Sequence, residues 1–222
     1  YIYQSIFGTN PSQMYSAGLS FNYDKYDEDF CDPVFNYGED ISTDFINMKR
    51  EERVPGVFFQ YTGEFLDQRF IVMAGLRYDY HNIFGSIWTP RAHIMYKPDE
   101  FTSIKATFGR GLRTPNILAE NSYLLASAAN FYVNGELLGK NPALLDDLKM
   151  EDSWNFGANV NRKFEVFGRT LNINLDYYHT KFNDQVVVDN ETAYNKVNFY
   201  NLDGDSYSNC YQVEVKYELI PR

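Results

Sequence analysis

Apolar and polar residues alternate with a period of two along most of the chain. In residues 70–81, Phe70, Val72 and Ala74 occupy every second position, with polar or small residues between them. The same alternation recurs in residues 15–24, 57–65, 91–97, 103–108, 154–161, 171–178 and 211–218. Successive side chains of a strand point to opposite faces, so each stretch predicts a strand with one apolar and one polar face. Strands of about 9–12 residues have the length that a tilted transmembrane strand requires.

The breaks between these strands alternate in length. If residues 1–8 form a first strand, the pattern predicts nine strands. The breaks at 9–13, 66–68, 82–89, 98–100 and 165–169 are short or medium, and those at 25–54, 111–150 and 182–206 are long. Outer-membrane barrels have short periplasmic turns and longer outer loops, whereas a soluble antiparallel sandwich has no reason to alternate in this way. The sequence therefore predicts an all-β fold, an antiparallel transmembrane β-barrel with the three long segments outside.

Composition agrees with this reading and excludes other classes. The chain has 222 residues, of which 18% are aromatic, a load that argues against disorder and suits the aromatic girdles of a barrel. A net charge of −10 argues against a general nucleic-acid binder, which needs a basic surface. The longest apolar run, residues 70–76, is far short of the about 20 residues of a membrane helix. Two cysteines cannot form a disulfide framework.

The pattern describes an incomplete barrel. Single-chain bacterial barrels usually have an even number of strands, and an open sheet edge cannot lie in lipid. The chain begins at Tyr1 without a secretory signal, and it ends at residues 219–222 without a closing strand. We therefore interpret residues 1–222 as a single segment of a larger barrel.

Three groups of residues carry a family resemblance. They are Arg53–Thr62 with Val72–Asp79; Thr89–Asn116 with Leu118–Asn121, Asn141, Pro142 and Glu151; and Tyr177–Gln185 with Asn201–Gly204 and Tyr211–Val215. In this order they resemble TonB-dependent outer-membrane receptors. The stretch 118–127 looks like receptors of the Bacteroidetes, including some compared with the cobalamin receptor.

The resemblance implies a barrel of about 22 strands closed by a plug, in keeping with the plugged lumen of very large barrels. It implies active import of a metal chelate, corrinoid or glycan through the outer membrane of a Gram-negative bacterium, driven by the TonB–ExbB–ExbD system. A surface lipoprotein is a further partner that it allows. The plug, the TonB-contacting segment and the closing strands are not in this sequence. One departure from the family is Cys210–Glu214, where Gly-Val-Glu is common.

Segment 111–150 is the main candidate for ligand contact. Long ordered loops are usually functional, and aromatic and amide side chains suit glycans, corrinoids or aromatic chelates. We expect a short helix over residues 116–129. Arg110 and Arg113 are expected to face the lumen, toward a ligand or toward the plug. The candidate ligand-binding residues are Arg110, Arg113, Asn116, Glu120, Asn121, Tyr123, Phe131 and Tyr132.

An acidic stretch in the first long segment is a candidate calcium site. Its carboxylates are Asp24, Asp27, Glu28, Asp29 and Asp32. Calcium prefers such oxygen clusters, and the resemblance to cobalamin receptors adds to the idea, but the spacing is not that of an EF-hand. The alternative is a solvated acidic loop.

The sequence argues against an enzyme but leaves two other functions open beside active transport. No catalytic elbow, metalloprotease motif or phosphate loop is present in the sequence, so we do not expect an enzyme. A passive porin would share the barrel but lack a plug. A soluble carbohydrate-binding β-sandwich would share the alternation.

Overall fold

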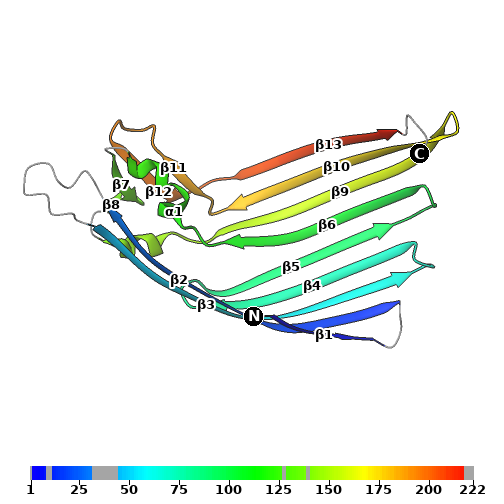
Figure 1. Cartoon of the computed structure of the whole chain (residues 1–222), viewed down its shortest axis with the longest axis horizontal. Coiled ribbons are helices and arrows are strands. Elements are labelled where there is room, and N and C mark those ends of the chain that lie inside the picture. The colour runs from blue at the N-terminus through cyan, green and yellow to red at the C-terminus, as the bar shows by residue number, and fades with distance from the viewer. Residues whose placement is uncertain (1, 9–11, 32–44, 127–128, 139–140, 218–222) are drawn as a thin grey trace, which may run out of the picture.

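The computed structural model describes residues 2–8, 12–31, 45–126, 129–138 and 141–217. Nine antiparallel strands form one curved sheet (Figure 1). Within this sheet the strands follow one another in chain order, and each is hydrogen-bonded to the next. They are β1 (Ile2–Phe7), β2 (Gln13–Cys31), β3 (Phe45–Phe65), β4 (Phe70–His81), β5 (Gly85–Tyr96), β6 (Thr102–Arg113), β9 (Glu151–Val166), β10 (Arg169–Asn183) and β13 (Ser206–Tyr217). The nine strands and their meander order confirm the prediction from the alternation.

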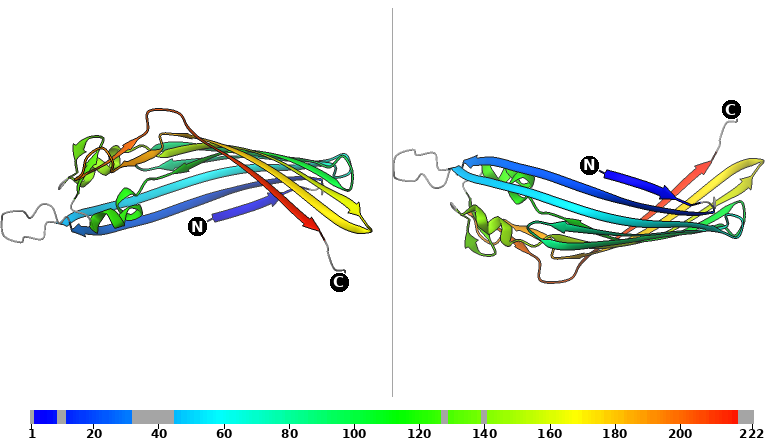
Figure 2. Two further views of the ribbon diagram at one scale, coloured as in Figure 1. Left: turned by 90° about the horizontal axis from the view of Figure 1, so that it is seen from above. Right: turned by 90° about the horizontal axis from the view of Figure 1, so that it is seen from below.

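The sheet is a bent trough rather than one layer of a sandwich (Figure 2). Its apolar face remains exposed within the part of the chain that the structure describes, and no second sheet packs on it there. Large side chains that are exposed on this face include Leu19, Phe21, Val57, Phe59, Leu76, Trp88, Ile94, Ile104, Phe156, Val160, Leu175 and Val213. A continuous exposed apolar surface of this kind fits contact with lipid, and the opposite, polar face then lines the lumen.

The first long segment is shorter than predicted. Residues 25–31 and 45–54 were expected in a loop, but β2 and β3 stay paired as far as Cys31 opposite Phe45. Charge density suggested a solvated loop there, yet several of the charges are matched across the hairpin. Lys25 lies opposite Glu51, and Asp27 lies opposite Lys49 with 3.8 Å between Oδ1 and Nζ. Opposite charges on facing strand positions favour pairing, which is why the strands continue.

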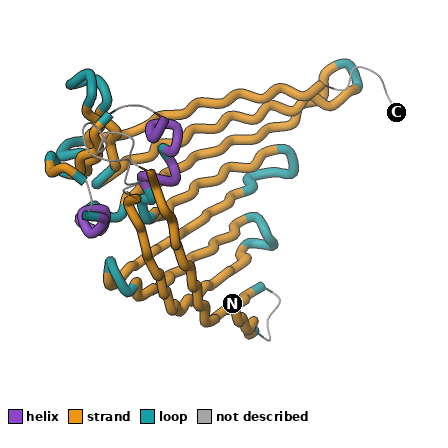
Figure 3. The backbone as a smooth tube through the Cα atoms, turned by 60° about the vertical axis from the view of Figure 1, so that its left-hand side comes forward, coloured by secondary structure: helices purple, strands orange, loops and turns teal. Residues whose placement is uncertain are grey.

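Two long segments fold together at one end of the sheet, as a unit that we call the loop layer (Figure 3). It contains α1 (Ile117–Glu120) and the 3-10 helices η2 (Ser122–Ala126) and η3 (Pro142–Asp147). A four-stranded sheet completes it, from β7 (Asn130–Val133), β8 (Glu136–Leu137), β11 (Val186–Asp189) and β12 (Lys196–Asn201). The expected helix over 116–129 is therefore one α-helical turn followed by a 3-10 turn.

The loop layer has its own hydrophobic core. β7 and β12 pair in parallel, so segments far apart in sequence lie side by side. The buried members of the core are Ile117, Leu118, Leu124, Ala129, Phe131, Val133, Leu138, Leu144, Leu145, Leu148, Val197 and Phe199. At the β7–β8 turn, Asn134 and Gly135 both have positive φ, as a type I′ hairpin requires. Among the described residues, no helix is long and apolar enough to cross a membrane.

The turn after β11 should respond to acid. The Asp189 carboxylate accepts hydrogen bonds from the Thr192 hydroxyl and from the N–H groups of Thr192 and Glu191, and these lower the pKa of Asp189. A lowered folded pKa stabilises the turn above the unfolded carboxyl pKa of about 3.9, and this stabilisation is lost as the pH falls through the folded value. An NMR titration of the Asp189 carboxyl carbon should give a midpoint below that reference. A midpoint at or above it would contradict the assignment.

Candidate functional site

The lumenal face has an open cavity of about 280 Å³ at the outer end of the sheet. Strands β2 to β5 supply its polar wall, and the ends of the 111–150 segment supply the rest. Its lining residues are Asn22, Asp24, Glu52, Val54, Arg77, Asp79, His81, Ile87, Thr89, Leu112, Thr114 and Met150. The cavity therefore combines charged groups of both signs with a few apolar side chains, and its lining is more polar than that of most small-molecule pockets.

A buried ion pair lies beside this cavity. Arg50 Nε is 2.9 Å from Glu52 Oε1, and the two side chains are only 7% and 10% exposed. Arg50 also donates from Nη1 to the carbonyl of Pro115 at 3.4 Å, and it lies 4.0 Å from Asp146. Its guanidinium lies over the ring of Phe84. Arg50 thus links β3 to both ends of the outer segment that follows β6.

His81 completes this cluster. Its Nδ1 accepts the N–H of Ile83 at 3.2 Å, so in the neutral ring the proton is on Nε2. Nε2 is 3.5 Å from Glu52 Oε2, which is within ion-pair range but without the alignment of a hydrogen bond. The Arg50 Nε contact with Glu52 has the same character, since it is close but poorly aligned. Glu52 is therefore shared between two buried basic groups.

A second ion pair lies deeper on the lumenal face. Arg77 donates to both oxygens of Asp79 at 2.6 and 2.7 Å, and to Ser20 Oγ at 2.7 Å. Gly56 leaves room for it, because a Cβ there would collide with Asp79 Oδ1. Two-point arginine–carboxylate pairs hold both partners in one geometry. This pair is therefore a fixed part of the wall, and its charges offset each other.

Arg113, one of the predicted ligand residues, is on the lumenal side and is already paired. It contacts Glu151 and lies 3.1 Å from Glu120, another predicted ligand residue. Glu151 also accepts the N–H of Val186 at 2.9 Å, which joins β9 to β11. The contact between Arg113 and Glu120 brings two of the predicted residues together beside a second cavity of about 330 Å³.

Arg110 lies on the other face of the sheet. It donates to both oxygens of Asp152 at 2.8 and 3.0 Å and stacks over Trp154, which in turn stacks on Phe108. Phe108 and Trp154 belong to the apolar face, so Arg110 does not face the lumen as expected. The reason is strand parity: Arg110 and Arg113 are three residues apart, so they cannot share a face.

The remaining predicted ligand residues differ in exposure. Tyr123 is 67% exposed, whereas Phe131 is 3% exposed and stacks on Phe199 in the core of the loop layer. Tyr132 is half-buried beneath the Lys196 ammonium. Asn121 donates to the carbonyl of Ile117, and the backbone N–H of Asn116 donates to Glu120. Phe131 thus has a packing role, and ligand contact by the others stays a prediction.

The calcium hypothesis gains no direct support. Asp24 and Asp27 lie on β2 rather than in a loop, three residues apart and therefore on opposite faces. Asp32 and the side chains of Glu28 and Asp29 lie outside the described residues. Within the described ranges, no three His, Cys, Asp or Glu side chains are close enough to hold a metal ion.

We call the cavity at the outer end of the sheet, together with the cluster of charged residues beside it, the outer site. Sequence reasoning missed Arg50, Glu52 and Asp146 as members of this site. Arg50 and Glu52 fell in a segment that was expected to be a solvated loop. Their spacing of two residues was the available signal, because it puts both on one face of a strand.

Comparisons with known proteins agree with the fold. The family model described as TonB dependent receptor-like, beta-barrel matches residues 2–218. A curated protein of Acinetobacter baumannii, the probable TonB-dependent siderophore receptor PirA, is 25% identical over 145 residues, which are 63% of this chain and 18% of that protein. The chain thus spans less than a fifth of this relative.

Solved structures share the fold at low identity. The siderophore receptor PirA of Pseudomonas aeruginosa has a TM-score of 0.64 at 16% identity, covering 96% of this chain and 35% of that one. The hemophore receptor HasR of Serratia marcescens, as a double mutant in complex with its hemophore HasA and heme, has a TM-score of 0.65 at 14% identity, covering 98% and 38%.

Proposed function

Because the chain belongs to the TonB-dependent receptor β-barrel family, we propose that it is part of a receptor that imports an iron chelate with energy from the TonB system. The chain lies in the outer membrane of a Gram-negative bacterium, where barrels of this family are found. The observation that carries the proposal is the family match over nearly the whole chain, together with relatives named for siderophores and for heme. Corrinoid and glycan cargo draw no support from these names.

The outer end of the lumenal face suits capture of such a chelate. The cavity at the outer end of the sheet contains both charges and apolar groups, and Tyr123 is exposed on the loop layer. In the proposed mechanism the loop layer captures the chelate and holds it above the lumen. A plug elsewhere in the longer chain then responds to TonB–ExbB–ExbD, and the barrel performs no chemistry. A surface partner, such as a lipoprotein, would approach the same end.

Uptake by the intact receptor tests this proposal. We expect cells that depend on the receptor to accumulate radiolabelled iron from a ferric siderophore or from heme, and to lose at least nine-tenths of this uptake when TonB is deleted. Cobalamin and oligosaccharides serve as competing cargo in the same assay. Uptake that persists without TonB would instead support the porin alternative, and uptake of cobalamin or oligosaccharide alone would replace the iron cargo.

A further inference from the structure

The charge of the outer site is unbalanced in favour of carboxylates. Its cavity is lined by the carboxylates of Asp24, Glu52 and Asp79, whereas Arg77 is the one arginine among the described residues that line it. Arg50 lies beside the cavity and is paired with Glu52. The outer site therefore holds more negative than positive charge, and it attracts a positively charged group.

Two of these carboxylates occupy facing strand positions. Asp24 of β2 lies directly opposite Glu52 of β3, and both line the same cavity. Like charges on facing positions destabilise a strand pair. Glu52 is offset by Arg50 and by His81, whereas the Asp24 side chain is exposed and has no ion pair or hydrogen bond within the described part of the chain. A positive charge bound between the two carboxylates would remove their repulsion.

The arginines at this end of the lumenal face are already matched by carboxylates. Arg77 donates to both oxygens of Asp79. Arg113 is shared between Glu120 and Glu151. A negatively charged chelate would therefore have to displace a carboxylate from a charge-assisted pair, and it would meet the surplus carboxylates as well.

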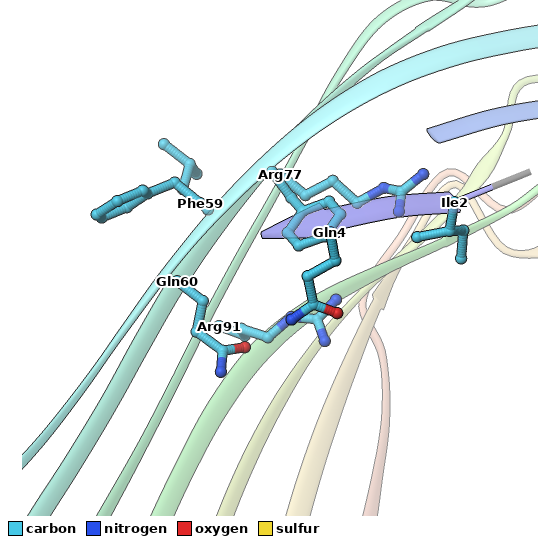
Figure 4. Close-up of a pocket in the computed structure, with 9 residues that line it drawn as sticks. Ile2, Gln4, Phe59, Gln60, Arg77 and Arg91 are labelled. Carbon is cyan, nitrogen blue, oxygen red and sulfur yellow. The ribbon is translucent and has the colours of Figure 1, made fainter. Parts of the chain in front are cut away.

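The wall nearer the middle of the strands has the opposite charge. A pocket of about 240 Å³ lies there across β1, β3, β4 and β5, and Figure 4 shows Gln4, Gln60 and Arg91 directed into one space. Arg77 also lines this pocket, and none of its described lining residues is acidic. The surplus of carboxylates is therefore a feature of the outer site and not of this part of the wall.

Two buried polar atoms at the outer cavity lack hydrogen-bond partners. They are Nε2 of His81 and Oγ1 of Thr89, and both residues line the cavity within the described ranges. His81 is only 3% exposed, and its Nδ1 accepts the N–H of Ile83, so Nε2 carries the proton. A buried donor without a partner is costly. A ligand with neutral oxygen atoms, such as those of amides, would supply the missing acceptor.

We propose that the outer site selects iron chelates that carry a protonated amine, with Asp24 and Glu52 binding the ammonium group. His81 donates from Nε2 to an amide oxygen of the same molecule. The cation is organic, because no three His, Cys, Asp or Glu side chains of the described chain are close enough to hold a metal ion. The inference rests on the proposed import of an iron chelate, and it names the class of chelate.

A matched pair of chelates tests the inference on the intact receptor. Ferrioxamine B has an ammonium group and amides, and its N-acetyl derivative differs only in lacking the charge. We expect ferrioxamine B to bind at least about tenfold more tightly, because hydrogen bonds to charged groups have this strength. Added salt should weaken the binding of ferrioxamine B and leave that of the N-acetyl derivative unchanged, because salt screens the charge.

The variant Asp24→Asn assigns the selectivity to the site. It keeps the shape of an exposed side chain and removes its charge. We expect the affinity for ferrioxamine B to fall at least about fivefold, while that for the N-acetyl derivative is unchanged. Asp27→Asn is the matched control, because Asp27 lies on the opposite face of β2 and pairs with Lys49. It should alter neither affinity.

Several outcomes would overturn the inference. Equal affinities for the two ferrioxamines, or an equal loss in Asp24→Asn and Asp27→Asn, would remove the ammonium site. Tighter binding of ferric enterobactin, a negatively charged chelate, or binding of heme alone, would overturn this inference and leave the proposed iron import standing. Binding of none of these iron compounds to a receptor with the gel mobility of a folded barrel would overturn both.

Discussion

Replacing Phe199 with Ala is expected to unfold the loop layer while the nine-stranded sheet stays intact. Phe199 is fully buried and stacks on Phe131, with ring centroids 6.2 Å apart. Removing a buried phenylalanine ring typically costs about 3–5 kcal/mol, because the cavity collapses only in part. The loop layer is small, so a loss of this size is a large part of its stability.

The effect should remain local because the sheet has its own hydrogen bonds. β12, which carries Phe199, pairs with β7 and β11 and not with any strand of the large sheet. In the intact receptor, trypsin should therefore cut near the exposed Lys149 at least tenfold faster in Phe199→Ala, while the gel mobility of the folded barrel is unchanged. Tyr194→Ala, at a fully exposed position two residues before β12, is the control and should be cut at the wild-type rate.

Phe199→Leu separates cavity formation from simple loss of aromaticity. Leucine keeps most of the buried volume, so its cleavage rate should lie between those of the wild type and the alanine variant. Equal cleavage of Phe199→Ala and the wild type would show that the core of the loop layer does not hold it together. The proposed function adds a further expectation: cargo affinity should fall in Phe199→Ala, because Glu120 and Tyr132 are positioned by this core.

The large sheet was predictable because its information is local. A period of two, continued over 70–81 or 171–178, fixes both the strand and its two faces without reference to any partner. The reliance on local sequence also explains why residues 25–31 and 45–54 were wrongly predicted to lie in a loop. Whether a charged stretch stays in a strand depends on what lies opposite, and the pairing of Lys25 with Glu51 is not visible in either segment alone.

The loop layer and the outer site depend on contacts between distant segments. Phe131 looked like an exposed ligand residue because nothing near it in sequence shows that Phe199 will cover it. The parallel pairing of β7 with β12 joins the second and third long segments, and no local pattern predicts it. Arg110 was misplaced for a different reason, since its parity with Phe108 was available but the arginine itself suggested the lumen.

Replacing Arg50 with Met should detach the outer segment from the sheet. The change leaves the Glu52 carboxylate buried with only His81 nearby, and it removes the links to Pro115 and Asp146. Breaking a buried ion pair by removing one partner typically costs about 3–5 kcal/mol, because the remaining charge is uncompensated. We expect a lower urea midpoint for the intact receptor and faster trypsin cleavage near Lys149.

The double variant Arg50→Met, Glu52→Leu separates the two effects of losing Arg50, which are the unpaired charge of Glu52 and the lost links to the outer segment. If the stranded charge dominates, removing Glu52 as well should restore most of the urea midpoint, since a buried pair can often be replaced by apolar residues at little cost. The links to Pro115 and Asp146 would still be absent, so cleavage near Lys149 should stay fast. A double variant with the low urea midpoint of Arg50→Met but wild-type cleavage near Lys149 would contradict both assignments. The lost links would then lower the midpoint, and the unpaired charge of Glu52 would speed the cleavage. Arg53→Gln, at an exposed pair with Glu51, is the matched control and should change neither quantity, because exposed pairs contribute little.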